Sequence, residues 1–140
     1  MKAKFLSVLL ALTMVLSLLP TAVLAKDKTV STEEELKQAI ESVSDGDTIT
    51  VSGTIEVNAP LVVTHTITLT GGSIVASNNF TSNSNQLADF NLISLKTAGK
   101  TLTLKNITLN ANGKSLVVYC NAGKVVVDGA TITGGKTSSY

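Results

Sequence analysis

The stretch HTITLTGG, residues 65–72, sets a pattern that most of the chain follows. Two apolar residues alternate with threonines, and a residue that tolerates a left-handed backbone comes two positions after the second of them. Three other stretches share the arrangement: DTITVSG (47–53), KTLTLKN (100–106) and KVVVDGA (124–130). A strand with one apolar face, followed each time by the same kind of corner, predicts a repeating β unit.

Each repeat continues beyond its corner. A second apolar segment follows in all four repeats (TIEV, GSIVAS, NITLN and ATIT), and a third follows in the first three (PLVV, NLISL and SLVVYC). Three short strands per repeat predict a coil of triangular cross-section, in which each strand pairs in parallel with its equivalent one coil away. We therefore expect an all-β parallel solenoid of about three to four coils.

The inward residues of successive coils should stack in ladders. The first inward positions are Ile49, Ile67, Leu102 and Val125, spaced by 18, 35 and 23 residues, and the second are Val51, Leu69, Leu104 and Val127. The long middle interval contains SNNFTSNSNQLADF, residues 77–90, which we call the excursion. Without this polar segment, that repeat also has a length in the low twenties.

The segment before the first coil has a helical period. Leu36, Ala39, Ile40 and Val43 fall on one helical face. Thr32 and Glu35 have the spacing of a capping box, with Ser31 and Glu34 as the alternative frame. We predict a helix over 32–43 that ends at DGD and covers the first coil. The domain organisation is then an N-terminal segment (26–47) with a capping helix, followed by coils over 48–140 that are incomplete at the C-terminus.

The first 25 residues have the order of a secretory signal peptide. A basic MKAK precedes the apolar run FLSVLLALTMVLSLL, and PTAVLA ends in small residues, so we expect cleavage after Ala25. A membrane anchor is the alternative, but the run is shorter than the roughly 20 residues that span a bilayer. We therefore expect a secreted or cell-surface protein, with no membrane association after cleavage.

Charge and cysteine content exclude several classes. Lys2 and Lys4 precede the expected cleavage point, so 9 of the 11 lysines remain against 10 acids. This balance provides no basic patch for nucleic acid. The only cysteine, Cys120, cannot form an internal disulfide, and we interpret it as a buried, apolar-type residue.

The end of the chain predicts an association surface. GGKTSSY follows the second strand of the fourth coil, without a capping element. An uncovered last coil exposes unpaired backbone and the ends of the apolar ladders. We expect either self-association through this coil or a longer solenoid of which this chain is the N-terminal part.

Taken together, these segments resemble a known family. The leader, TEEELKQAI, DGDTITVSGTIEV and the ITL-type coils are similar to the right-handed parallel β-helix proteins of the pectate-lyase-like superfamily, nearest to adhesin-like, repeat-rich extracellular proteins of bacteria. The resemblance covers residues 30 to 135 and implies a right-handed coil with an N-terminal capping helix. The fold carries lyases, hydrolases, adhesins and phage tail proteins alike, so it implies no single activity.

The residues that such enzymes use are missing from the pattern. Lyases of this superfamily use clustered acidic calcium ligands and an arginine or lysine base, whereas this chain has no arginine. Its acids after the first corner, Glu56, Asp89 and Asp128, are far apart. His65, the only histidine, has no partner motif, so we interpret it as structural. We expect no catalytic residue, cofactor or metal ligand here. The alternative is the N-terminal part of a secreted polysaccharide lyase or another carbohydrate-active enzyme.

Two further stretches have a second interpretation. The carboxylates of Asp45 and Asp47 flank Gly46 and suit a hard cation, but one pair is far short of six to eight oxygen ligands, which favours a helix-to-strand turn.

T-x-T motifs occur on three coils, as the pairs Thr48/Thr50, Thr66/Thr68 and Thr101/Thr103. Stacked rows of this kind resemble ice-binding faces, although threonine is also a common residue on exposed strands.

The most plausible recognition element is the excursion, because function tends to lie on loops held by rigid scaffolds. Its candidate residues are Asn79, Phe80, Asn83, Asn85 and Phe90. The alternative is that the two rings only pin the loop to the coil. We predict a non-catalytic extracellular β-helix module that acts as a structural, adhesive or carbohydrate-binding surface. Its expected partner is an extracellular polysaccharide or a ligand on a host or cell surface.

Overall fold

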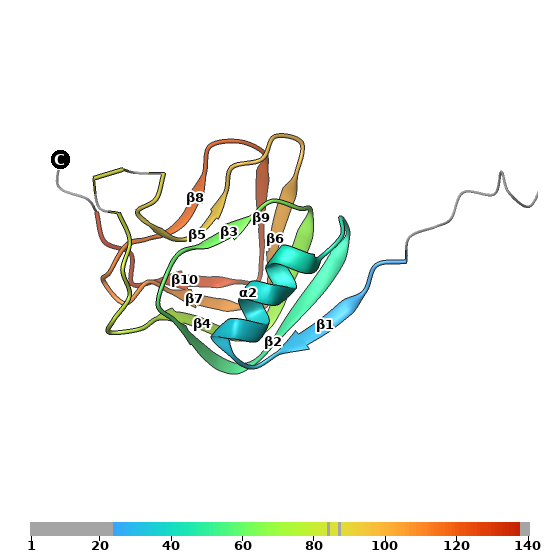
Figure 1. Cartoon of the computed structure of the whole chain (residues 1–140), viewed down its shortest axis with the longest axis horizontal. Coiled ribbons are helices and arrows are strands. Elements are labelled where there is room, and N and C mark those ends of the chain that lie inside the picture. The colour runs from blue at the N-terminus through green and yellow to red at the C-terminus, as the bar shows by residue number, and fades with distance from the viewer. Residues whose placement is uncertain (1–23, 84, 87, 138–140) are drawn as a thin grey trace, which may run out of the picture.

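The computed structural model describes residues 24–83, 85, 86 and 88–137 (Figure 1). Most of the expected signal peptide, residues 1–25, lies outside the described residues. The elements are β1 (Asp27–Val30), α2 (Glu33–Ser42), β2 (Asp47–Val57), β3 (Leu61–Val63), β4 (Ile67–Ala76), β5 (Asn91–Leu95), β6 (Thr101–Lys105), β7 (Thr108–Asn110), β8 (Leu116–Cys120), β9 (Lys124–Asp128) and β10 (Thr131–Thr133).

The strands form the predicted parallel β-solenoid with three sides. The first side has the order β1-β2-β4-β6-β9, and the second consists of the later halves of β2 and β4 with β7 and β10. The third side has the order β3-β5-β8. Figure 1 shows the three sides around a common core, and every ladder between named strands is parallel. The all-β class with one capping helix is confirmed.

The corners between the first two sides lie where the sequence predicts them. Gly53, Gly71, Asn106 and Gly129 all have positive φ, at 72°, 85°, 47° and 68°. A left-handed residue reverses the local curvature of the strand, so the chain leaves one side and begins the next. This explains why only glycine and asparagine occupy these four positions.

The solenoid has about five turns rather than the expected three to four. The additional turn begins with β1, which pairs in parallel with the first residues of β2 from Asp27↔Thr48 to Val30↔Val51. Only Val30 of this strand is buried. The segment KDKTV therefore has too few apolar residues to reveal a strand by its pattern.

The predicted register between the first two full coils is wrong by two residues. Ile49 pairs with Leu69, not with Ile67, while Ile67 pairs with Leu102 and Leu102 with Val125 as expected. The ladder slips between Val51 and Thr54, where β2 has one more residue than β4. The expected register set Gly53 beside Gly71, but the ladder pairs Gly71 with Val51, so the two corner glycines do not lie opposite each other.

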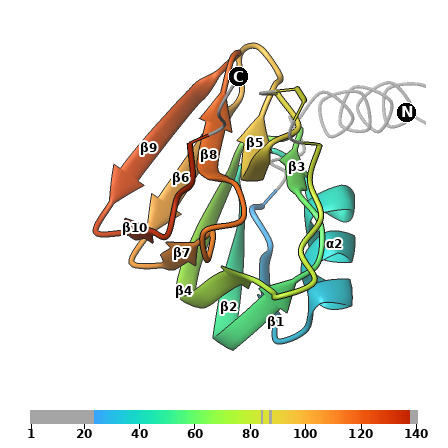
Figure 2. The same ribbon diagram turned by 90° about the vertical axis from the view of Figure 1, so that its left-hand side faces the viewer.

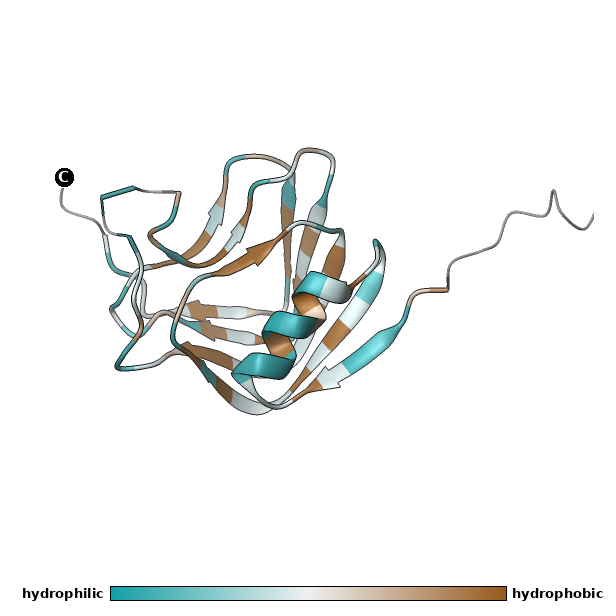
Figure 3. Ribbon diagram, in the orientation of Figure 1, coloured by the Kyte–Doolittle hydropathy of each residue, from teal (hydrophilic) through white to brown (hydrophobic). Residues whose placement is uncertain are grey.

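Inward residues form continuous ladders through the core. Ile49, Leu69 and Leu104 stack in register and are fully buried. The next member, Val127, is 54% exposed, because no described strand pairs with the outer edge of β9. The two inward residues expected in the last coil, Val125 and Val127, are therefore inward by register but only partly buried. Figure 3 shows the hydrophobic bands along the strands.

Helix α2 lies at the N-terminal end of the solenoid, as predicted. It packs against β1, β2 and β3, and buries Leu36, Ala39 and Ile40. The side chain of Thr32 caps it by accepting a hydrogen bond from the amide of Glu35 at 3.2 Å. Figure 2 shows α2 at one end of the coil and β9 with β10 at the other.

The C-terminal end has no such cover among the described residues. Cys120, predicted to be buried, is exposed at the end of β8, because the strand lies at the edge of its sheet. In the part of the chain that the structure describes, no helix is long and apolar enough to cross a membrane.

Candidate functional site

The excursion is fastened to the solenoid by its two aromatic rings. Phe80 and Phe90 are both buried, at 8% and 4% exposure. Aromatic rings that bind sugars need an open face, so these rings serve as anchors rather than as stacking platforms. The polar residues of the excursion are what remains accessible.

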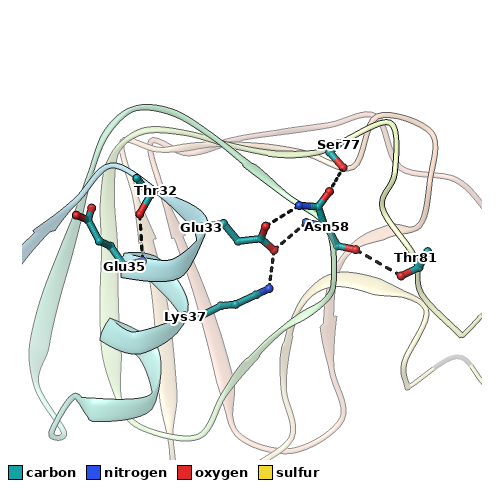
Figure 4. A network of polar contacts seen from close by, with 7 residues as sticks. All are labelled: Thr32, Glu33, Glu35, Lys37, Asn58, Ser77 and Thr81. Carbon is teal, nitrogen blue, oxygen red and sulfur yellow. Dashed lines mark hydrogen bonds and ion pairs between the residues drawn. The ribbon is translucent and has the colours of Figure 1, made fainter.

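Polar contacts around Asn58 fix the beginning of the excursion (Figure 4). Ser77 donates from its hydroxyl to Asn58 Oδ1 at 2.6 Å, and the amide of Thr81 donates to the Asn58 carbonyl at 3.0 Å. Asn58 Nδ2 donates to Glu33 Oε2 of α2 at 2.7 Å. Glu33 also forms an ion pair with Lys37 at 2.6 Å. The helix, the first full coil and the excursion therefore meet at one asparagine.

A groove lies between the excursion and the third side of the solenoid. Its volume is about 360 Å³. The excursion contributes Thr81, Ser82, Asn83, Ala88 and Asp89, and the solenoid contributes Pro60, Val62, Asn91, Ser94 and Lys96. Val62 of β3 is 47% exposed and gives the groove an apolar surface.

Two buried polar atoms in the groove lack partners. Asn91 is fully buried and Ser94 is 1% exposed. Asn91 Nδ2 donates to the carbonyl of Ala88 at 2.7 Å. Asn91 Oδ1 and Ser94 Oγ have no hydrogen-bond partner among the described residues. Buried polar atoms are almost always satisfied, so two unsatisfied atoms on the single strand β5 are the unusual feature of this groove wall.

The charges of the groove neutralise each other. Lys96 Nζ forms an ion pair with Asp89 Oδ1 at 2.8 Å, and both side chains are partly exposed. This pair links the end of the excursion to the residue that follows β5. The groove therefore offers mainly neutral hydrogen-bonding groups and an apolar floor.

A second depression continues the groove toward α2. It shares Pro60 and Val62 with the groove and has a volume of about 220 Å³. Its other wall contains Lys37, Ile40 and Glu41 of the helix. The two depressions together form an elongated site, with Val62 in the shared part.

The structure brings only some of the predicted residues to this site. Asn79, Asn83 and Asn85 are exposed, and of these only Asn83 lines the groove. Asn83 Oδ1 also accepts a hydrogen bond from the Asn85 amide at 3.1 Å, which makes a tight turn. The sequence reasoning missed Asn91 and Ser94. Their signal was the presence of two polar residues in NLISL, where the other third-side strands are more apolar.

The aspartates of the DGD segment have structural partners. Asp47 Oδ1 accepts from the Lys26 amide at 2.8 Å, and its Oδ2 accepts from the Ser44 amide at 2.9 Å. These backbone hydrogen bonds lower the pKa of Asp47. The hydrogen bond from Lys100, followed by the one from the Thr66 amide, lowers the pKa of Asp45. These contacts account for both carboxylates as elements of a turn.

The threonine rows are shorter than the T-x-T motifs predict. One row runs from Thr48 to Thr68 and on to Thr103. In the neighbouring row, Thr50 pairs with Thr70. Thr70 then pairs with Lys105, a charged residue. Two adjacent threonine rows therefore extend together over two coils rather than three. The register differs by two residues from the predicted one, so Thr66 and Thr101 belong to another row.

Two charged side chains, Asp89 and Lys96, are among the described residues that line the groove. No group of three or more His, Cys, Asp or Glu side chains suited to a metal occurs within the ranges that the structure describes. Asp89 is the only carboxylate in the wall of the groove, and it is paired with Lys96. Comparison with family models, with curated proteins and with solved structures finds no match, so the fold and this groove are the basis for assigning a role.

Proposed function

We propose that this chain is a non-catalytic extracellular binding module whose groove holds a segment of a neutral polysaccharide. The observation that carries the proposal is the pair of unsatisfied atoms, Asn91 Oδ1 and Ser94 Oγ. Both residues line the groove, and because each of the two atoms has less than 1 Å² of exposed surface, the proposal requires the groove to open slightly around them when a molecule binds. Sugar hydroxyls suit both atoms, because a hydroxyl donates as well as accepts.

The shape and the floor of the site also favour a saccharide chain. The two depressions that meet at Val62 accommodate a linear molecule better than a compact one. Pro60 and Val62 provide an apolar surface for the C–H faces of sugar rings. Among the described residues that line the two depressions, both lysines are in ion pairs, Lys96 with Asp89 and Lys37 with Glu33, so we assign the site to neutral sugars.

Location and kinship belong to the same proposal. The signal-like order of residues 1–25 supports export, and the capping helix with a three-sided coil supports kinship with right-handed parallel β-helix proteins of the pectate-lyase-like superfamily. The third side supports the site, because its strand β5 carries both Asn91 and Ser94.

Binding is tested by a matched pair of buried serines. Ser94→Ala removes an unpaired hydroxyl, so the free energy of unfolding should stay equal or rise by up to about 1 kcal/mol. The same change should weaken saccharide binding about fivefold or more. Ser115 is also fully buried, but its hydroxyl donates to the Leu116 carbonyl at 2.9 Å outside the groove. Ser115→Ala should therefore lower stability and leave binding unchanged.

The measurement is titration calorimetry with neutral oligosaccharides of two to six sugars, and with an acidic oligosaccharide for comparison. Chemical denaturation provides the stability of each variant. If no neutral oligosaccharide binds at millimolar concentration, the proposal fails. It also fails if Ser94→Ala and Ser115→Ala change the affinity equally, or if the acidic oligosaccharide binds more tightly.

A further inference from the structure

The last described strands of the solenoid expose a strand edge and apolar side chains. β9 is the last strand of the first side, and no described strand pairs with its outer edge. Val127 is 54% exposed and Ile132 of β10 is 40% exposed, although both continue buried ladders. A free parallel edge with exposed apolar ladder ends is a template for another strand.

The hydrogen bonds of β9 show which of its residues face this free edge. The Lys124 amide donates to the Lys100 carbonyl at 2.9 Å, and the Asp128 carbonyl accepts from the Asn106 amide at 2.9 Å. In a parallel ladder, alternate residues direct both backbone groups to the same neighbour. Lys124, Val126 and Asp128 therefore bond toward β6, which leaves the backbone groups of Val125 and Val127 directed outward.

The sequence of β9, KVVVD, is complementary to itself in the antiparallel direction. With a two-fold axis at Val126, Val125 lies opposite Val127 of a second copy, and Lys124 lies opposite Asp128. The first pair consists of the two residues whose backbone groups are free, so each can exchange two hydrogen bonds with its partner. The second pair brings opposite charges to adjacent positions, where they attract. The direction of the free backbone groups and the charges of the side chains therefore favour the same register.

We propose that the chain forms a closed, two-fold dimer in which β9 pairs antiparallel with β9 of a second copy. Neither Lys124 nor Asp128 forms an ion pair within the part of the chain that the structure describes, so both are available. The dimer brings Val125 of each copy against Val127 of the other and removes both side chains from water.

A head-to-tail arrangement is less suitable. It would set the C-terminal end of one copy against the N-terminal end of the next, where α2 packs over β1, β2 and β3 (Figure 2). Such stacking also produces open filaments, because a heterologous contact does not close. The helix at one end and the self-complementary strand at the other therefore limit assembly to two copies. This inference is independent of the groove and of its ligand.

The test reverses or exchanges the charges of Lys124 and Asp128 in protein expressed from the full chain. Sedimentation equilibrium over a range of concentrations measures the mass of each variant. Asp128→Lys places like charges opposite each other twice, so the dimer dissociation constant should rise about tenfold or more. Lys124→Asp should have a similar effect. The double variant Lys124→Asp with Asp128→Lys restores both attractions, and its dissociation constant should return to within about threefold of the original.

Glu56→Lys is the matched control, because it makes the same charge change at an exposed position of β2, away from the C-terminal end. Its dissociation constant should not change. Thermal unfolding of each variant shows that the solenoid is intact. A chain that stays monomeric at all concentrations overturns the proposal, as does growth into species larger than a dimer. Failure of the double variant to recover dimerisation would overturn the Val126-centred register.

Discussion

At the scale of single residues, two successive glycines determine how the first full coils meet. A methyl group on Gly71 would lie 2.5 Å from the Val51 carbonyl oxygen, and one on Gly72 would overlap the Gly53 carbonyl oxygen. Neither methyl group fits without displacement of the backbone. TGG is thus not only a flexible corner, since the missing side chains allow the backbones of adjacent coils to come into contact.

A pair of substitutions separates these two effects. Gly53 and Gly71 both have positive φ, so Gly53→Ala and Gly71→Ala should each destabilise the fold by about 1–2 kcal/mol through backbone strain. Around Gly53 a methyl group meets nothing within 4 Å. Gly71→Ala should cost about 1–3 kcal/mol more, because of its contact with Val51. Urea denaturation measures both values, and equal losses would contradict the close approach.

Residue types predicted the corners but not the register. Every described residue with a positive φ is a glycine or an asparagine, so the residue types at the four corners could be found from sequence. The two-residue error arose because Gly53 and Gly71 are equivalent in conformation but not in register. The unsatisfied atoms of Asn91 and Ser94 could not be predicted either. Whether a polar residue on a strand is satisfied depends on what the excursion places over it, and periodicity contains no such information.

At the scale of elements, α2 and the excursion depend on each other through one turn. Glu33 accepts hydrogen bonds from the Asn58 amide at 2.9 Å and from its Nδ2 at 2.7 Å. The other side of Asn58 holds Ser77, the first residue of the excursion. The helix was predictable from its apolar period and capping box. Its attachment was not, because Glu33 and Asn58 are 25 residues apart and belong to no common motif.

Asn58→Ala should therefore loosen two elements at once. The change removes the side-chain hydrogen bonds to Glu33 and Ser77, and the free energy of unfolding should fall by about 1–2 kcal/mol. Amide exchange should accelerate in α2 and in the described part of the excursion, but not in β6. The control is Asn78→Ala, at the exposed asparagine that follows Ser77. It should change neither the free energy of unfolding nor the exchange rates. Uniformly faster exchange throughout the solenoid would contradict this local role.

At the scale of the whole molecule, carboxylates connect successive coils along one edge. Asp45, before the first full coil, accepts from the Thr66 amide at 2.7 Å in the second coil and from Lys100 in the third. The Lys100 carbonyl in turn accepts from the Lys124 amide of the fourth coil. Parallel β pairing could be predicted from the repeats. This chain of polar contacts could not, because it depends on corners whose lengths differ from coil to coil.

The carboxylates predict that the solenoid loses stability in acid. The hydrogen bond from Lys100 lowers the pKa of Asp45, and backbone hydrogen bonds from Lys26 and Ser44 lower the pKa of Asp47. A hydrogen bond from the Ser31 amide likewise lowers the pKa of Glu35. A carboxyl group whose pKa is lower in the folded state stabilises that state above its ordinary pKa. The contribution disappears as the pH falls through the folded value.

With ordinary values of 3.8 for aspartate and 4.5 for glutamate, the free energy of unfolding should be constant at neutral pH and decline as the pH falls below about 4.5. Asp45→Asn removes one of the titrating groups, so its stability at neutral pH should be lower and its decline in acid shallower. Urea denaturation between pH 7 and pH 2.5 measures both curves. Parallel curves would mean that Asp45 does not connect the coils through its charge, because the difference between the two proteins must shrink as Asp45 becomes protonated.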